Sequence, residues 1–450
     1  MKLSSFLAVV LSLSAAAASA RTAGEERPSV APKTYKAYLV CDAHLDTQWN
    51  WDVQTTIREY IPRTLFQNLY LMERFPDYRF SFEGAVKYKW MKEYYPLQYE
   101  RMKRYIASGQ WHIAGASWDA NDPNMPSAES FIRNILLGQE FYKREFGVRS
   151  TDIFLPDCFG FGYTLPTLAA HCGLIGSSTQ KLSWRGRDFY DAPYHRKNPF
   201  SWGVWYGIDG SSLLAAFDTG GYSDELPENV QYNARLMERA ANGFDNTCFR
   251  YYSGGGYHVG DMGNSGTVAT CRRLTEALND PEAPIEVVSA TSDDLFLAYL
   301  DRKDELPSYD GELLMDVHAT GCYTSQTAMK YYNRRNEELA GAAERASVAA
   351  DWLGALPYDG AKLNEIWQRF IWHQFHDDLT GTSIPEAYTW SWNDELIALS
   401  QSADVMSTAV GALSGSLDTR AKGTPVVVYN YGHEIEMYTV EQGEKRDKRQ

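Results

Sequence analysis

Three short segments of this 450-residue sequence carry side chains that could bind a metal ion or attack a substrate. In HLDTQW, His44 and Asp46 stand two residues apart. In an extended segment they point to the same side and offer one nitrogen and one oxygen to a metal. Asp157 follows an apolar run in LPDCFG, where Pro156 cannot extend a ladder of hydrogen bonds. Alternatively, the H-x-D pair forms an ordinary polar turn and Asp157 caps the turn after it.

The third segment, QFHDDLTGTS, closes an amphipathic stretch at a turn that contains glycine. A histidine at the carboxyl end of a helix is often only a favourable charge at the negative end of the helix dipole. Asp377 and Asp378, directly after His376, argue against that role because they add negative charge there. A bound cation would explain such crowding. We assign His373 to packing or to support of the ligands.

Together, His44, Asp46, Asp157 and His376 form a set of two nitrogen and two oxygen ligands. This set suits zinc better than magnesium or calcium, which prefer oxygen ligands throughout. The sequence therefore predicts one zinc ion per chain.

The elements that must position these residues alternate between strands and helices. Short apolar or alternating runs predict strands over 36–41, 78–82, 151–155 and 174–179, and apolar spacing predicts helices over 58–75 and 126–146. This order indicates a parallel α/β sheet, in which binding groups gather at the carboxyl ends of the strands. After Gly203 we expect short strands, with a hairpin turn at 207–210.

From about residue 327 to 413 the pattern becomes helical, and residues 363–376 place their apolar side chains on one stripe. The run PVVVYNY (425–431) predicts a single further strand. The fold class is therefore a parallel-sheet α/β catalytic domain followed by a helical bundle, with only the start of a β domain. The expected divisions are a signal peptide (1–20), a linker (21–34), the α/β domain (35–322), the helical domain (323–415) and the first β strand (424–450).

The net charge and composition of the sequence limit the kinds of partner that the chain can bind. A formal net charge of −15 is unsuited to a nucleic acid or an anionic membrane surface, and a neutral substrate fits it. Lys2, the apolar run 6–13 and Ala18-Ser19-Ala20 indicate a secretory signal, which predicts a secreted, periplasmic or lumenal protein. No later segment reads as a membrane span. Six scattered cysteines without a C-x-x-C pair argue against a thiolate zinc site and are compatible with one or two disulfides.

In their order, the three segments resemble those of glycoside hydrolase family 38, the class II α-mannosidases. HLDTQW is similar to the family's H-x-D-x-x-W metal segment, DCFG to its nucleophile segment, and QFHDDLTGTS to its distal His-Asp segment. Weaker resemblance covers four further stretches, so that the likeness runs from about residue 36 to the end: 109–111 with 127–133, 181–184, 200–202 and 323–326.

The resemblance implies a retaining enzyme that removes terminal α-linked mannose from a glycan. His44, Asp46, Asp157 and His376 would hold the zinc, and Asp157 would also attack the anomeric carbon to form a covalent mannosyl-enzyme. Trp49 would stack on the sugar, and Asp377 would accept hydrogen bonds from its hydroxyl groups. An N-glycan, a yeast-type mannan and a small disaccharide all remain open as substrates.

The proton donor is assigned to Asp261, in the glycine-rich segment GGYHVGDMG, which resembles the family's Gly-Asp segment. The alternative is an aspartate in a flexible turn, and Asp316 and Asp119 are then the next candidates. A donor must stay protonated near neutral pH, which favours a carboxyl group somewhat apart from the metal.

The chain departs from the family in one respect, because family members continue into β-rich domains that are missing after PVVVYNY. We therefore expect a C-terminally truncated member that lacks these domains as packing partners. Two other functions stay open: a non-catalytic remnant that binds zinc and glycan, and a zinc-dependent carbohydrate deacetylase, which uses His and Asp with a metal-activated water.

Overall fold

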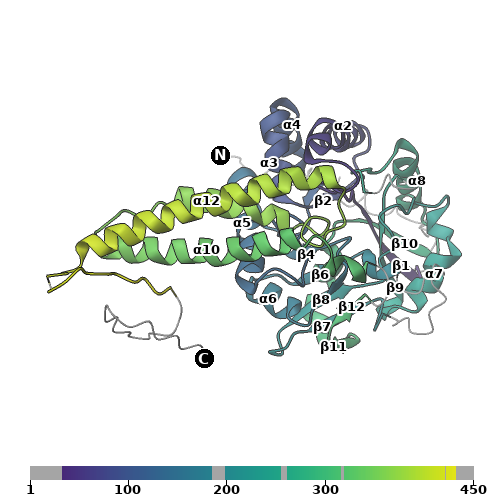
Figure 1. Cartoon of the computed structure of the whole chain (residues 1–450). Coiled ribbons are helices and arrows are strands. Elements are labelled where there is room, and N and C mark those ends of the chain that lie inside the picture. The colour runs from purple at the N-terminus through teal and green to yellow at the C-terminus, as the bar shows by residue number, and fades with distance from the viewer. Residues whose placement is uncertain (1–32, 185–197, 255–260, 316–318, 421, 432–450) are drawn as a thin grey trace, which may run out of the picture.

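The computed structural model describes residues 33–184, 198–254, 261–315, 319–420 and 422–431. It consists of an α/β domain and a helical part, in which the two long helices α10 (Thr327–Trp352) and α12 (Pro385–Ser416) extend away from that domain (Figure 1). The expected signal peptide, nearly all of the expected linker, the glycines before Asp261, Asp316 and residues 432–450 lie outside the described residues.

The first sheet has the strand order β10-β1-β9, and all its strands run parallel. Its central strand, β1 (Tyr35–Cys41), is the strand predicted over 36–41. Its last five residues are buried, because β9 (Thr247–Tyr252) and β10 (Ile285–Ala290) flank it and helices cover the sheet. A central parallel strand covered in this way requires the continuous apolar run seen in the sequence.

The second sheet has the order β11-β7-β8-β6-β4. β4 (Asp152–Phe154), β6 (Gly176–Ser178) and β8 (Ser212–Ala216) are parallel, whereas β7 (Trp202–Tyr206) runs antiparallel to β8 and pairs with β11 (Ser308–Asp310). The predicted turn at 207–210 joins β7 to β8: Gly207 N donates to Ser211 O (2.9 Å), and Gly210 has a φ of +82°.

Two short strands, β2 (Phe80–Phe82) and β3 (Trp111–Ile113), pair in parallel and connect the two sheets. In the order β1, β2, β3, β4, β6, β8, β9 the strands form a closed ring. Three contacts complete it: the Asp42–Ser81 bridge, Ala116 N to Asp152 O (3.0 Å), and Tyr251 N to Thr219 O (2.8 Å). The carboxyl ends of the parallel strands therefore surround one space, as in other closed α/β barrels.

Helices cover the outside of this ring (Figure 1). The predicted helix 126–146 is α5, which begins after Ser127, whose side chain accepts from Ser130 N, and ends at Gly147 in the left-handed conformation. The predicted helix 58–75 is a π-helical turn (Thr56–Tyr60) followed by α2. The helices of this domain are α1 (Val53–Thr55), α2 (Ile61–Met72), α3 (Ala85–Tyr94), α4 (Pro96–Ser108), α5 (Ala128–Phe146), α6 (Leu165–His171), α7 (Ala234–Ala241), α8 (Val268–Leu278) and α9 (Asp294–Tyr299).

The helical part consists of α10 (Thr327–Trp352), α11 (Gly360–Ile371) and α12 (Pro385–Ser416). Small buried residues such as Ala346 and Ala409 let α10 and α12 approach closely. By length and composition alone, α12 is long and apolar enough to cross a membrane. Only 17% of its most apolar stretch is buried in the structure. The parallel α/β sheet and the helical domain confirm these parts of the predicted fold class.

Two local predictions were wrong. The apolar stripe over 363–376 is not one helix: α11 ends at Ile371, a 3₁₀ turn covers Trp372–Gln374, and Phe375 is extended with ψ of 143°. Residues 425–431 form no strand, since none of the strands among the described residues pairs with them. All six cysteines have free thiols, and none is paired in a disulfide.

Candidate metal centre and active site

The candidate site lies where the carboxyl ends of the ring strands meet. His44 and Asp46 follow β1, Asp157 follows β4, and Asp261 comes from the segment after β9. His376 arrives from the helical part and joins them. All five residues are at least 94% buried, as Asp157 and Asp261, the most exposed of them, retain 6% exposure each. The structure thus brings together every residue of the predicted ligand set.

The ligand atoms of this set are close to one another. His44 Nε2 lies 2.8 Å from Asp46 Oδ1, and His376 Nε2 lies 3.5 Å from the same oxygen and 3.8 Å from Asp157 Oδ2. Ligands of a tetrahedral ion at about 2.0 Å from each atom are roughly 3.3 Å apart. The observed distances scatter around that value, so the four side chains fit around one ion.

Unpaired polar atoms support the same conclusion. Both ring nitrogens of His44, Asp46 Oδ1 and His376 Nε2 are buried without a hydrogen-bond partner among the described residues. Buried polar atoms almost always have a partner, because desolvating them without one costs about 1–3 kcal/mol each. An ion bound to these atoms would remove the penalty. The residues present therefore fit a metal ion.

His376 is held in the orientation that a ligand needs. Its Nδ1 lies 3.0 Å from the carbonyl oxygen of Ala120, an acceptor only, so Nδ1 carries the proton and Nε2 keeps its lone pair for the site. The extended backbone at Phe375 pairs with Asn121 and carries His376 to this position. Gly138 on α5 lets that helix lie against the Ala116 carbonyl, since a Cβ there would be 2.1 Å from the oxygen.

Asp157 is fixed by two groups that the sequence analysis did not assign to the site. Lys181 Nζ lies 2.6 Å from Asp157 Oδ1, and the Tyr222 hydroxyl donates to the same oxygen at 2.8 Å. Burial acts to raise the pKa of Asp157, but Lys181 and the two histidines outweigh it and hold the pKa below its ordinary value. The carboxylate is therefore ionised. Lys181 follows β6 and Tyr222 follows β8, and their position at strand ends was the available signal.

Asp261 has the opposite charge state. In the absence of a bound ion, burial and the negative charges of Asp46 and Asp157 raise the pKa of Asp261 to about 9, so this carboxyl group then carries its proton at neutral pH. Its backbone carbonyl accepts from Asp46 N at 3.0 Å, which ties the segment after β9 to the one after β1. A carboxylate oxygen of Asp261 also lies within 4.8 Å of the ligand atoms of His44 and Asp46. The structure thus places this residue beside the predicted metal ligands, nearer to them than the sequence analysis expected of a proton donor.

Of the two predicted substrate residues, Asp377 lies within the cluster and Trp49 lies on a neighbouring loop. Asp377 is buried, groups with Asp46 and His376 within 4.8 Å, and accepts from the Thr382 hydroxyl. Trp49 is half-buried on the loop that follows Asp46, and its carbonyl accepts from Ile384 N (2.8 Å) just before α12.

The remaining candidates are placed elsewhere or not described. Asp119 forms a buried ion cluster with Lys87 (3.2 Å), which also binds Glu83, so it is committed to a structural contact. Asp316 lies outside the described residues. His373 Nδ1 lies 2.7 Å from Asp378 Oδ2, which agrees with a supporting role rather than with metal binding.

The structure thus combines a closed ring of parallel strands with a helical bundle. A buried cluster of histidines and carboxylates lies at the carboxyl ends of the strands. This combination is that of a catalytic domain. Two family models match the chain: "Glycosyl hydrolases family 38 N-terminal domain" over residues 34–312 and "Alpha mannosidase middle domain" over 317–413. The chain belongs to glycosyl hydrolase family 38.

Named relatives agree. Over 85% of this chain, the sequence is 31% identical to alpha-mannosidase G of Dictyostelium discoideum. Over 76% of this chain, it is 30% identical to human alpha-mannosidase 2C1. The crystal structure of an alpha-mannosidase from Enterococcus faecalis V583 superimposes with a TM-score of 0.68 at 19% identity, covering 86% of this chain and 43% of that one. The chain spans about a third of the length of these two relatives, namely 34% and 31%.

Proposed function

We propose that this chain is a zinc-dependent, retaining α-mannosidase that removes terminal α-linked mannose from a glycan. The observation that carries the proposal is the convergence of His44, Asp46, Asp157 and His376, in which buried atoms of His44, Asp46 and His376 have no hydrogen bond and face one another. Two nitrogen and two oxygen ligands favour zinc among common biological ions. The alpha-mannosidase names of the relatives support the substrate class.

In the first step, the ionised Asp157 attacks the anomeric carbon of the mannose. The bond between that carbon and the glycosidic oxygen breaks, and Asp261 gives its proton to the departing oxygen. Lys181 and Tyr222 keep Asp157 ionised and oriented during the approach. The products of this step are the released alcohol and a mannosyl ester on Asp157.

In the second step, the ionised Asp261 takes a proton from water while the water oxygen attacks the anomeric carbon. The ester bond to Asp157 breaks, and mannose leaves with its original α configuration. Trp49 stacks on the sugar ring, and Asp377 accepts hydrogen bonds from its hydroxyl groups. When bound, zinc supplies positive charge that orients the sugar hydroxyl groups and stabilises negative charge in the site.

The test is hydrolysis of an aryl α-mannoside by the chain, before and after chelation and again after zinc is restored. We expect activity that disappears on chelation and returns with zinc, and α-mannose as the first product in a proton NMR time course. Activity that is unaffected by complete metal removal, or β-mannose as the first product, would contradict the proposal. A folded chain that binds mannose without hydrolysing it would support the non-catalytic remnant instead.

We also propose that the chain is secreted, from the charged, apolar and small-residue pattern of residues 1–20. Expression with and without these residues, followed by assay of the medium and the cell fraction, tests this. Equal retention of both forms in the cytosol would contradict it.

A further inference from the structure

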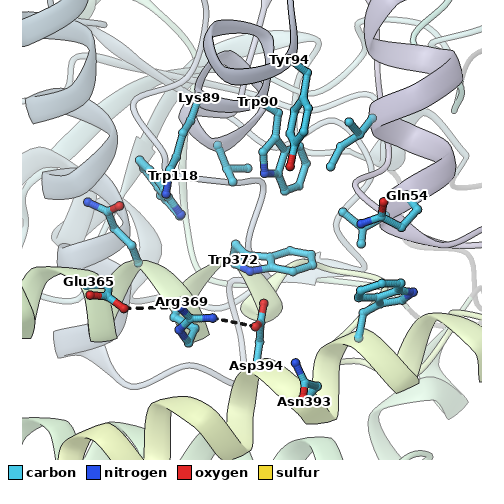
Figure 2. Close-up of a pocket in the computed structure, with 15 residues that line it drawn as sticks. Gln54, Lys89, Trp90, Tyr94, Trp118, Glu365, Arg369, Trp372, Asn393 and Asp394 are labelled. Atoms are coloured by element: carbon cyan, nitrogen blue, oxygen red, sulfur yellow. Dashed lines mark hydrogen bonds and ion pairs between the residues drawn. The ribbon is translucent and has the colours of Figure 1, made fainter.

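Apart from the candidate metal centre, a cavity of about 310 Å³ opens between the α/β domain and the helical part. Helices α1 and α3 form one side, and the end of α11 with the first turns of α12 forms the other (Figure 2). None of the residues of the metal cluster lines it. Its volume lies at the lower end of the roughly 300–1,000 Å³ range of small-molecule sites.

Aromatic rings dominate its walls. The Trp90 and Trp372 rings are perpendicular, with centroids 5.7 Å apart, and Tyr94 lies beside Trp90 (Figure 2). Trp390, on α12, contributes a ring that is 39% exposed. A pyranose ring presents a face of C–H groups, which aromatic faces bind by dispersion and by burial of apolar surface. The cavity therefore offers the surfaces on which a sugar ring stacks.

Several polar groups in the same cavity have no partner of their own. The side-chain amides of Gln54, Gln368 and Asn393 make no hydrogen bond to any other described residue. An amide offers a donor and an acceptor side by side, which suits two neighbouring hydroxyl groups.

The charges of the cavity cancel and select a neutral ligand. Arg369 lies 2.9 Å from Asp394 and 3.4 Å from Glu365, so its charge is already neutralised (Figure 2). Lys89, the other cation of the lining, stands over the Trp118 ring at 5.7 Å. Two cations against two carboxylates leave no excess charge to attract a phosphate, a sulfate or an ammonium group.

We propose that this cavity is a second, non-catalytic sugar-binding site that takes one neutral hexopyranose unit of a glycan. It does not depend on the proposed hydrolysis. It is nevertheless joined to the catalytic region, because Asp394 Oδ2 lies 3.4 Å from His373 Nε2 and the other ring nitrogen of His373 contacts Asp378. The sugar is either another arm of the glycan in the catalytic site or part of a separate glycan.

The test uses the full chain, stripped of metal so that it is not turning over, and calorimetric titration with methyl glycosides of mannose, glucose, galactose and N-acetylglucosamine. Trp390→Ala and Asn393→Ala change exposed lining residues. Trp392→Ala is the matched control, because Trp392 is on the same helix, is 40% exposed against 39% for Trp390, and does not line the cavity.

We expect saturable binding of at least one glycoside, weakened about tenfold or more by Trp390→Ala and unchanged by Trp392→Ala. Absence of binding for all four glycosides, or equal weakening by the two tryptophan variants, would overturn the proposal. Because the readout is binding without metal, this outcome is independent of whether the chain hydrolyses mannosides.

With binding established, kinetics distinguish the two sources of the sugar. If Trp390→Ala raises KM for a branched mannooligosaccharide but not for an aryl mannoside, the site holds an arm of the substrate itself. If neither KM changes, the site holds a separate glycan.

Discussion

Lys181 Nζ lies 2.6 Å from Asp157 Oδ1, and both side chains are buried at the carboxyl ends of neighbouring strands, β6 and β4. Tyr222 donates to the same oxygen, so one oxygen of Asp157 is fully occupied by the protein. The other, Oδ2, faces His376 at 3.8 Å. This division lets a single carboxylate be anchored on one side and remain available to metal and substrate on the other.

Removing the lysine should therefore slow the reaction without preventing substrate binding. We expect Lys181→Met to lower kcat by about a hundredfold, because a preorganised charge next to the reacting carboxylate is lost, with little change in KM. Steady-state kinetics on an aryl α-mannoside measure both. Tyr222→Phe, which removes a neutral donor from the same oxygen, should cost less. A normal kcat for Lys181→Met would show that the contact only stabilises the fold.

Removal of the His44 imidazole should weaken metal binding. We expect His44→Ala to copurify with much less than one zinc per chain and to lose activity, since the ring nitrogens of His44 are buried and make no hydrogen bond among the described residues. Elemental analysis of the purified protein measures the metal. His171→Ala is the control, because His171 is exposed and paired with Asp209 far from the cluster in sequence. Equal zinc in both variants would contradict the assignment of His44.

The convergence of the four proposed ligands could be expected from the sequence because each of them stands next to a strong local signal. The apolar run of β1 precedes His44 and Asp46, and that of β4 precedes Asp157, so that strand ends could be located from composition alone. His376 was found from the unfavourable acids beside it. Its place among the others depends on the break of α11 at Ile371 and the extended Phe375, which helical periodicity did not predict.

Other features depend on contacts between residues distant in sequence. Lys181 lies in a stretch that resembles the family, but its contact with Asp157 becomes evident only when β6 is placed beside β4. Closure of the strands into a ring rests on single contacts such as Tyr251 to Thr219, which no local pattern predicts. The strand expected over 425–431 shows the converse, because a strand-like pattern forms a strand only where a partner is present.

Substitution of the proposed proton donor should separate substrates by leaving group. We expect Asp261→Asn to lower kcat/KM by about a hundredfold or more for alkyl mannosides and mannobiose, whose leaving groups need a proton. Aryl mannosides with acidic phenols should lose far less in the first step. A plot of kcat/KM against leaving-group pKa measures this. Equal losses for all substrates would mean that Asp261 acts as a metal ligand and that another residue donates the proton.

Burial of Glu395 in the helical domain should make the fold less stable as the pH rises. This carboxyl group is fully buried between α12 and α10, and Asn336 Nδ2 donates to its backbone carbonyl (3.0 Å) and to its carboxylate. Burial, with smaller effects of nearby Asp378 and Glu337, raises its pKa to about 8. Glu395 Oε1 and Asn336 Oδ1 remain without partners among the described residues.

The folded pKa exceeds the ordinary value, so the folded chain holds a proton that the unfolded chain releases. Stability is therefore unaffected below about pH 4.5, falls between about pH 4.5 and 8, and stays reduced above that range. Glu395→Gln cannot ionise, and its new NH₂ group can donate to Asn336 Oδ1. We expect the variant to gain roughly 2–4 kcal/mol over the natural chain on going from pH 5 to pH 8.

Thermal unfolding at pH 5 and pH 8 measures this gain as a difference in midpoint temperature between the two chains. Glu276→Gln, on the exposed face of α8, makes the same chemical change without burial and should show no gain at either pH. If Glu395→Gln gave the same difference at both pH values, the gain would come from the new hydrogen bond alone. If the variant were less stable at pH 8, the carboxylate would have to be ionised in the fold and compensated by a cation between α10 and α12.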